Sequence, residues 1–382
     1  MLNKINFLTA GESHGQGLMG IIQGIPSNLE IDKQYINYHL SRRQKGFGRG
    51  ARMKIEKDSA TIYCGIRNGK TIGAPIGLII PNLDWKNWNN IMNVEKHQKS
   101  VEKITLPRPG HADLAGILKY QFDDIRNVIE RSSARETTMR VALGTICRKF
   151  LEELDIHIAS YVTKINTIAD HNIYDFPIHS INKRSDKSEI RCLDKKIEKQ
   201  MINTIKQAQK NGDTVGGKFQ ILVSGAPYGL GSYIAWDKKL NAKLAESICS
   251  INAIKTITFG RDSSSDNYGS ELHDEIFYNN NHFTRSTNNA GGIEGGMSNT
   301  QHITISATMK PLSTLSQPLQ SVDIKDKKSK MAHKERTDTC AVPAAAVIAE
   351  SMVAIVLADS ILDKFGGDSM QELKQHFKSA QF

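Results

Sequence analysis

Two histidines in glycine-rich turns are the residues best suited to proton transfer in this 382-residue chain. His14 belongs to the Gly-Glu-Ser-His-Gly segment at residues 11–15, and His111 lies between a Pro-Gly turn and Asp113. Histidine changes its charge near neutral pH, so it is a frequent general acid or base. A lone histidine is more often structural than catalytic. A protein that only binds anions by charge does not need two histidines in similar turns, so the pair favours an enzyme.

The basic segment at residues 42–52 is suited to binding anions. It carries five cations among glycines, and we expect it to be a loop. Such a loop lets backbone amides and guanidinium groups approach an anion closely, and the planar fork of arginine fits phosphate and carboxylate. The alternative is an RGG-like nucleic-acid segment. That type is usually repeated and interleaved with aromatic residues, whereas this segment occurs once and contains only Phe47.

A second anion-attracting site is predicted at a helix start. Ser133 and Glu136 have the spacing of a capping box, and the apolar residues behind them recur at helical spacing. Ser132 and Ser133 should therefore lie at a helix N-terminus, whose N–H groups and dipole attract anions, with Arg131 and Arg135 beside them. The alternative is a solvated cap with two surface arginines.

Two later segments carry further polar groups. Residues 288–299 are rich in glycine and asparagine, which allows close approach of the backbone to a ligand. Arg336 and Asp338 precede the last apolar helix and could place a guanidinium and a carboxylate at its mouth.

Several short motifs match well-known sites without their context. Residues 11–15 fit the nucleophile elbow of serine hydrolases, but they leave no room for the earlier strands of that fold. Residues 15–20 fit a dinucleotide fingerprint, but a strand-like segment follows where a helix is required. Residues 212–218 nearly form a P-loop, yet Phe219 stands in place of Ser or Thr. The rival classes are therefore a serine hydrolase acting through Ser13 and an RNA-binding protein acting through the basic segment.

Composition is typical of a globular protein with anionic partners. Hydrophobic residues make up 39% and charged residues 24% of the chain, which excludes a disordered or fibrous protein. The five cysteines are scattered without a CxxC pair, so a disulfide framework or zinc ribbon is not expected. Since no signal peptide is evident and the apolar stretch at residues 341–358 is interrupted by Pro343 and Glu350, we expect a cytoplasmic protein. The net charge of +10 favours nucleic acid, phosphorylated metabolites or nucleotide cofactors.

The predicted elements that position these loops are those of an α+β protein. Strands are predicted at residues 5–9, 21–23, 61–63, 76–80, 219–223 and 303–309. Helices are predicted at residues 34–40, 196–211, 240–251 behind Asp237 as N-cap, and 343–362 with one core face. Residues 170–193 are predicted to be a surface excursion. Gly-Ala-Pro-x-Gly occurs at residues 73–77 and 225–229, which is compatible with two similar halves, and without a linker one large domain fits as well as two.

The order of these segments resembles that of the chorismate synthase family. The segments that carry the resemblance are residues 11–15, 42–56, 108–113, 130–137, 291–299, 310–311 and 336–338. They follow the family's order across nearly the whole chain, which is far more specific than any single motif. Two positions depart from the family pattern: Thr300 replaces a usual glycine and should stiffen a loop on the flavin side. Thr337 replaces a frequent histidine, so that position is not expected to be essential.

The resemblance implies a lyase that converts 5-enolpyruvylshikimate 3-phosphate to chorismate and phosphate. This 1,4-elimination is the last common step of the shikimate pathway in aromatic amino acid biosynthesis, and it needs reduced FMN without net redox change. The substrate carries a phosphate and two carboxylates, so several guanidinium groups are what the reaction requires. NADPH would serve only as an indirect reductant of this flavoprotein, because nothing in the sequence is typical of an added reductase domain.

The resemblance also implies catalytic roles. His14 would donate a proton to the leaving phosphate, and surrounding anions would keep it charged. His111 would support the reduced flavin ring by proton donation. Asp338 would take the flavin N5 proton, after which the flavin removes the C6 hydrogen of the substrate. Ser13 and Ser132 match serines that relay protons.

The binding residues follow in the same way. The arginines expected to hold the substrate are Arg43, Arg49, Arg52, Arg108 and Arg135. The residues expected to bind FMN are Arg131, Ser132, Ser133, Asn252, Ala253, Gly295, Lys310, Pro311, Leu312, Ser313, Thr314 and Arg336. The implied fold is a β-α-β sandwich with an internal pseudo-twofold, a single α+β domain over residues 1–382. It would be assembled as a homotetramer without metal, nucleic-acid or membrane partners.

Overall fold

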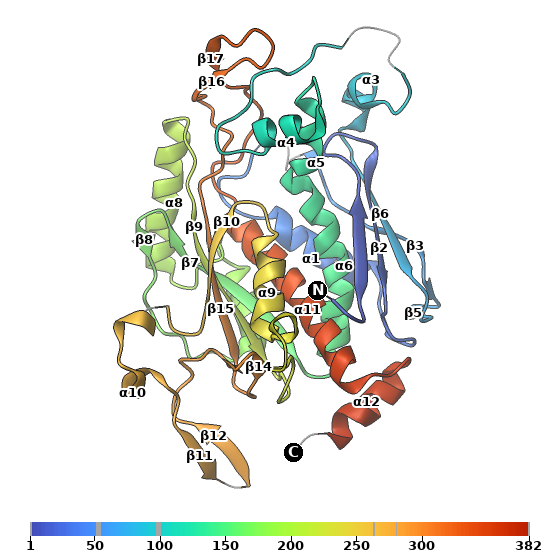
Figure 1. Ribbon diagram of the computed structural model, residues 1–382, viewed down its shortest axis with the longest axis vertical. Helices are drawn as coiled ribbons and strands as arrows, with labels where there is room; N and C mark the ends of the chain where they lie inside the picture. Colours follow the sequence, from blue (N-terminus) through green and yellow to red (C-terminus); the bar gives the residue numbers. More distant parts are fainter. Residues whose placement is uncertain (1, 51–54, 97–100, 263, 280, 381–382) are drawn as a thin grey trace.

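Two antiparallel sheets enclose a layer of helices in the computed structural model of the chain (Figure 1). The structure describes residues 2–50, 55–96, 101–262, 264–279 and 281–380. The first sheet has the order β1 (Asn6–Ala10), β2 (Gly17–Gln23), β6 (Ile76–Pro81) and β3 (Thr61–Cys64). The second has the order β10 (Ile254–Phe259), β15 (Ile303–Met309), β9 (Gly217–Ser224), β7 (His157–Ile165) and β8 (Ile168–Ala169). Helices α6 (Thr137–Glu152) and α11 (Val342–Phe365) lie between the sheets, flanked by α1 (Lys33–Gln44) and α9 (Leu240–Cys249), so the expected β-α-β sandwich is confirmed.

Shorter elements connect these layers. The helices and helical turns are η1 (Trp85–Asn87), α3 (Asn89–Met92), α4 (Asp113–Tyr120), α5 (Arg126–Ser132), η2 (Ala134–Glu136), α7 (Ile178–Ser185), α8 (Lys195–Lys210), η3 (Trp236–Lys238), η4 (Ser264–Asp266), α10 (Gly269–Leu272) and α12 (Met370–Ser379). The strands are β4 (Ile66–Arg67), β5 (Lys70–Thr71), β11 (Ile276–Asn279), β12 (His282–Arg285), β13 (Ile293–Glu294), β14 (Met297–Ser298), β16 (Gln320–Val322) and β17 (Ser329–Met331).

The two main sheets repeat one topology, as an internal pseudo-twofold requires. In the first sheet the strands β1, β2, β3 and β6 are arranged first-second-fourth-third, and β7, β9, β10 and β15 have the same arrangement in the second. A long helix follows the last strand of each set, α6 in one half and α11 in the other. The two Gly-Ala-Pro-x-Gly copies do not mark this repeat. The first runs into the start of β6, the fourth strand of its set, whereas the second follows β9, the second strand of the other set.

Apolar side chains alternate along the strands and face the helices. In β9, Phe219, Ile221 and Val223 are buried while the residues between them are partly exposed, as in a sheet with one covered face. The prediction of a single core face on the last long helix is wrong. Helix α11 is buried on all sides from Val342 to Leu362, because it packs against α6, α9 and the second sheet. It is long and apolar enough to cross a membrane, but its most apolar window is entirely buried in the fold.

Arg42 belongs to the core and not to the basic loop. Helix α1 extends past Arg43, so the prediction of a loop beginning at residue 42 is wrong. Arg42 donates to both carboxylate oxygens of Glu350 at 2.8 and 3.0 Å, and Arg148 and Arg191 contact the same carboxylate at 2.5 and 3.1 Å. Burial alone would raise the pKa of Glu350, but the three guanidinium groups outweigh it and hold this pKa well below its ordinary value.

Two further local predictions differ from the structure. Residues 170–193 include α7, whose Ile178 and Ile181 are buried beside β7, so the segment is not merely a surface excursion. Two isoleucines one turn apart are too short a pattern to predict a helix. Helix α9 begins after Lys239, and Asp237 lies in the preceding turn, so Asp237 is not its N-cap.

Candidate active site

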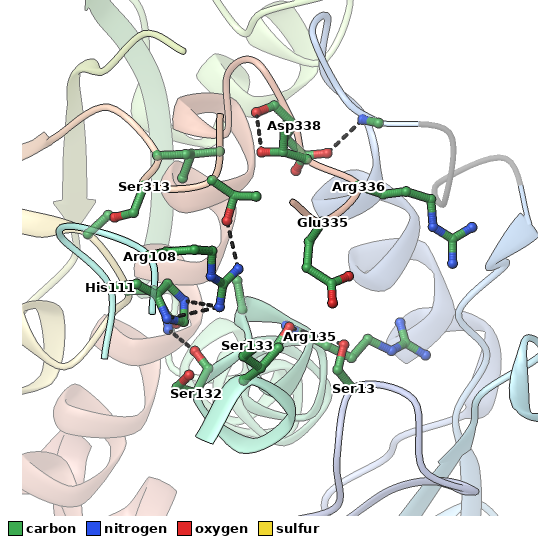
Figure 2. A pocket seen from close by; sticks show the side chains of 18 of the residues that line it. Ser13, Arg108, His111, Ser132, Ser133, Arg135, Ser313, Glu335, Arg336 and Asp338 are labelled. Atoms are coloured by element: carbon green, nitrogen blue, oxygen red, sulfur yellow. Dashed lines mark hydrogen bonds between the residues drawn. The ribbon is translucent and has the colours of Figure 1, made fainter. Parts of the chain in front are cut away.

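One cavity of about 390 Å³ is lined by loops from both halves of the chain. The lining comes from segments at residues 13–14, 43–50, 108–112, 129–135, 252–253, 310–314 and 335–338. Figure 2 shows side chains from several of these segments facing a common opening. The described residues that line the cavity include six arginine or lysine side chains and two carboxylates, so its lining is cationic.

Most of the predicted site residues line this cavity. They are Ser13, His14, Arg43, Arg49, Arg108, His111, Ser132, Ser133, Arg135, Asn252, Ala253, Lys310, Leu312, Ser313, Thr314, Arg336 and Asp338. Thr337, which was expected to be inessential, lines it as well. Segments more than 300 residues apart in the sequence therefore meet at one place.

Three predicted residues do not line the cavity, and a fourth lies outside the described residues. Arg131 does not line the cavity, and its guanidinium donates to the backbone carbonyl oxygens of Thr9 and Gly11. Gly295, in the turn of the β13–β14 hairpin, and Pro311 do not line it either. Arg52 lies outside the described residues.

His14 is held on two sides. Its Nδ1 lies 3.0 Å from both carboxylate oxygens of Glu130, and its backbone N–H donates to the same carboxylate at 2.7 Å. The imidazole stacks on Trp88 with the ring centroids 3.8 Å apart. Burial alone would raise the pKa of Glu130, but the hydrogen bonds from His14 and the charge of Arg126 outweigh it and lower this pKa. Because a carboxylate only accepts, we assign the proton to Nδ1, which leaves Nε2 for a second partner.

Ser133 and Ser13 connect this histidine turn to the start of α6. The Ser133 hydroxyl donates to that of Ser13 at 3.1 Å, and the Ser13 backbone N–H donates to the carbonyl oxygen of Glu130. Ser133 caps η2 by accepting from the backbone N–H of Arg135, so its prediction at a helix start is confirmed.

The prediction for Ser132 at that helix start is wrong. Ser132 is the last residue of α5, and its hydroxyl donates to the carbonyl oxygen of Val128 at 2.6 Å. In a capping box the Glu136 carboxylate would accept from the backbone N–H of Ser133. Here it accepts from the side chains of Arg140 and Thr9 instead. Tertiary partners thus outcompete the local capping pattern.

His111, Arg108 and Asp113 form one charged group. Asp113 accepts from His111 Nδ1 at 2.6 Å and from Arg108 Nε at 2.8 Å, and Arg108 also donates to the Thr314 hydroxyl at 2.8 Å. Burial alone would raise the pKa of Asp113, but the hydrogen bonds from His111 and Arg108 outweigh it and hold this pKa well below its ordinary value. Asp113, in the first turn of α4, therefore orients two side chains that line the cavity.

Arg43 and Arg135 share the buried counter-ion Asp58. Arg135 makes a short contact with Asp58 and donates from Nε to Asn82 at 2.9 Å, while Arg43 Nη1 lies 3.8 Å from Asp58. Burial lowers the pKa of Arg43 to about 9, and Asp58 opposes that shift. Nη1 of Arg43 and Nη2 of Arg135 are buried and make no hydrogen bond to a described residue, and the nearest carboxylates are Asp58 at 3.8 Å and Glu56 at 3.7 Å.

Asp338 is fixed by the loop that follows α1. The backbone N–H of Gly50 donates to Asp338 at 2.6 Å, and Arg49 Nε lies 3.3 Å from its other oxygen. A Cβ at position 50 would come within 2.9 Å of the Thr337 carbonyl oxygen, so this close approach requires glycine.

A polar group beside the His111 turn comes from the segment after β15. Lys310 Nζ and the Ser313 hydroxyl both donate to the carbonyl oxygen of Gly110, at 2.6 and 2.7 Å. Asn252 Nδ2 donates to the carbonyl oxygen of Ser132 at 2.9 Å, which joins the β10 side of the cavity to α5.

The carboxylates that hold the site were missed from the sequence. Glu130 and Asp113 lie within the quoted motifs, so their proximity to site residues was a usable signal. Asp58 and Trp88 lie outside those motifs, and Arg135 and His14, which they contact, are 77 and 74 residues away in the chain. Thr300, which adopts a left-handed φ of +73°, does not line the cavity, so its expected stiffening concerns a loop elsewhere.

The chain is similar to known proteins along nearly its whole length. A family profile described as chorismate synthase matches residues 5–362. A chorismate synthase of Alkaliphilus metalliredigens is 50% identical over 376 residues, covering 97% of this chain and 98% of that one. A chorismate synthase of Enterococcus faecalis is 49% identical over 379 residues, covering 98% of each chain. A crystal structure of a chorismate synthase superimposes with a TM-score of 0.80 at 36% identity, covering 99% of this chain and 98% of the other.

Proposed function

The chain belongs to the chorismate synthase family, and we propose that the cavity lined by His14, His111 and Asp338 is its active site. The reaction is the loss of phosphate from 5-enolpyruvylshikimate 3-phosphate to give chorismate, a lyase step of the shikimate pathway to aromatic amino acids. The observation that carries the proposal is the convergence of six basic side chains and two histidines on one opening. Family membership favours this activity over those of a serine hydrolase or an RNA-binding protein.

The substrate is proposed to bind through the arginines. A trianion needs several fixed cations, and Arg43 and Arg135 both line the cavity. Arg49 and Arg108 supply two further guanidinium groups, held at 3.3 Å from Asp338 and 2.8 Å from Asp113. Because these groups are fixed before the reaction, they would stabilise the charge that develops on departing phosphate without reorganising.

Proton transfer to the leaving phosphate is proposed for His14. Its Nδ1 is occupied by Glu130, so Nε2 is the atom that would give up a proton. Ser13, linked to Ser133 at 3.1 Å, and Ser132 are proposed proton relays beside it.

The remaining lining fits reduced FMN. Lys310, Thr314 and Asn252 offer cationic, hydroxyl and amide donors, Ser313 offers a hydroxyl acceptor, and Ile129, Ala134 and Leu312 offer apolar surface for a flat ring. Ser133, Ala253 and Arg336 complete this proposed set. Reduced FMN supplies an electron-rich ring that assists removal of the substrate's C6 hydrogen. With the flavin bound, His111 would donate a proton, and the Asp338 carboxylate would accept one.

We further propose a cytoplasmic homotetramer whose FMN is reduced by an outside donor. The support is family membership, and light scattering of the purified protein would test the assembly.

An anaerobic assay tests the activity and the site together. With dithionite-reduced FMN and the enolpyruvyl substrate, the protein should form chorismate, which is followed by its absorbance. His14→Ala should lower turnover by about 10²–10⁴-fold, the usual effect of losing a general acid. His171→Ala, at an exposed histidine, serves as the control and should leave turnover unchanged. Full turnover in His14→Ala would remove His14 from the mechanism.

A further inference from the structure

His14 is supported by three side chains that do not themselves line the cavity. Glu130, which is 2% exposed, contacts the ring nitrogen and the backbone of His14. Trp88 stacks on the imidazole at 3.8 Å. Arg126 lies over the Trp88 ring, 5.2 Å from its centroid, and donates to the Glu130 carboxylate at 3.2 Å. Neither catalysis nor substrate binding has been assigned to any of the three.

These supports extend to the segment that carries Asp338. Arg126 donates to Glu335 at 3.0 Å, and His333 contacts the same carboxylate at 3.0 Å. The Trp88 indole N–H donates to Asp84 at 3.2 Å, and Asp84 also accepts from Arg336 at 3.0 Å. Among the described residues, Glu130 and Arg126 are charged groups beside His14 and Trp88, and Asp84, Glu335, His333 and Arg336 are one contact further out.

Glu130 and Trp88 hold the imidazole from two directions. A carboxylate at 3.0 Å stabilises a neighbouring cation, and a stacked indole face does the same through its π-electrons. Arg126 shares the Glu130 carboxylate with His14. The two bonds to Glu130 also fix the side-chain χ angles of His14, so Nε2 points in one direction.

We propose that Glu130 and Trp88 are positioning residues that keep His14 charged and aimed as the proton donor, and that Arg126 moderates this effect. The inference rests on the proposed role of His14. Glu130 would act as the buried partner that sets the tautomer and charge of a catalytic histidine, and Trp88 as the surface that fixes the plane of its ring.

Steady-state kinetics of Glu130→Gln and Arg126→Met give the first test. Glu130→Gln should lower kcat by about 10²-fold with KM for the substrate within about twofold, because the lost interaction serves proton transfer and not binding. The pH above which activity is lost should be lower in Glu130→Gln than in wild type by about one unit or more. In Arg126→Met the same alkaline limb of the pH–rate profile should shift to higher pH. Asp123→Asn, at an exposed carboxylate, is the control and should shift neither.

Trp88 fluorescence gives a second test that does not depend on activity. In a chain carrying Trp85→Phe and Trp236→Phe, Trp88 is the remaining tryptophan of three. A stacked imidazolium quenches indole emission, so the emission should rise as pH increases. Adding His14→Ala should abolish that transition, and adding Glu130→Gln should move its midpoint to lower pH by about one unit or more.

The outcomes separate the two hypotheses. If His14→Ala loses activity but neither Glu130→Gln nor Arg126→Met moves the pH limb or the fluorescence midpoint, the positioning role is wrong and the proposed function stands. If His14→Ala keeps full turnover while the fluorescence midpoint still responds to Glu130, the coupling is real and the proposed role of His14 is wrong. Should Glu130→Gln fail to fold, the opposite shift expected of Arg126→Met decides the question.

Discussion

Replacing Glu350 with glutamine should destabilise the whole fold. The carboxylate is fully buried and accepts from Arg42, Arg148 and Arg191, and Arg42 and Arg191 are also paired with Asp186. Glutamine keeps one acceptor oxygen but places an NH₂ group against guanidinium donors. Breaking a buried ion pair by removing one partner typically costs about 3–5 kcal/mol, because the remaining charge is left uncompensated. We expect the free energy of unfolding to fall by that amount.

Urea unfolding at fixed protein concentration measures the effect. The slope rises with chain length above the value of about 1–3 kcal/mol per molar found for small proteins, so a loss of this size should lower the midpoint by about 1 M. The exposed substitution Glu102→Gln is the matched control and should change the free energy of unfolding by less than about 0.5 kcal/mol. A loss below about 1 kcal/mol in Glu350→Gln would contradict the assignment of this cluster as an essential charge balance.

The pH dependence supplies a second check. The pKa of Glu350 is depressed in the folded state, so its stabilisation is present above its ordinary value of 4.5 and is lost as pH falls below that value. Wild type should therefore lose stability on acidification below about pH 4.5, and Glu350→Gln should lack this part of the loss. Equal acid sensitivity in both proteins would mean that Glu350 carries no stabilising charge.

Three further predictions follow from the site and its loops. Arg49→Ala should raise KM for the substrate about 10- to 100-fold, the usual loss for a charged hydrogen bond, with a smaller change in the dissociation constant of FMN. The reverse result would mean that the loop is misassigned. Asp113→Asn should lower kcat/KM by at least about tenfold, because the histidine and arginine that it orients lose their common acceptor. Wild-type kinetics would show that both groups keep their positions without it. Thr300→Gly should raise the free energy of unfolding by about 1 kcal/mol, because a β-branched residue at φ +73° is strained. Thr308→Gly in β15 should have the opposite sign, and thermal unfolding of both variants tests the pair.

Regular elements with a strong period were predictable from the sequence. Strands β9 and β15 alternate between apolar and polar residues, and α8 presents Met201 and Ile205 one turn apart, so local burial on one face fixes their type. The position of helix α11 in the sequence was predicted, but its burial on all sides was not. A sequence pattern shows how apolar a helix is, whereas burial on all sides depends on how many layers pack around it.

The kinds of side chain that the loops supply were predictable from the sequence, but the groups that each side chain contacts were not. Arg42 and Arg43 are adjacent, yet one binds Glu350 in the core and the other lines the cavity. Successive helical residues point about 100° apart, so the docking of α1 decides which arginine faces which side.

The sequence alone determined the family resemblance, the alternation of strands, and the supply of histidines and arginines in glycine-rich turns. Tertiary structure decided which carboxylate each of these groups would meet: Glu130 for His14, Asp58 for Arg43 and Arg135, and Glu350 for Arg42. The physical reason is that charge pairing acts through space over a few ångströms. Partners that lie 15 to 308 residues apart in the chain leave no local pattern to be recognised.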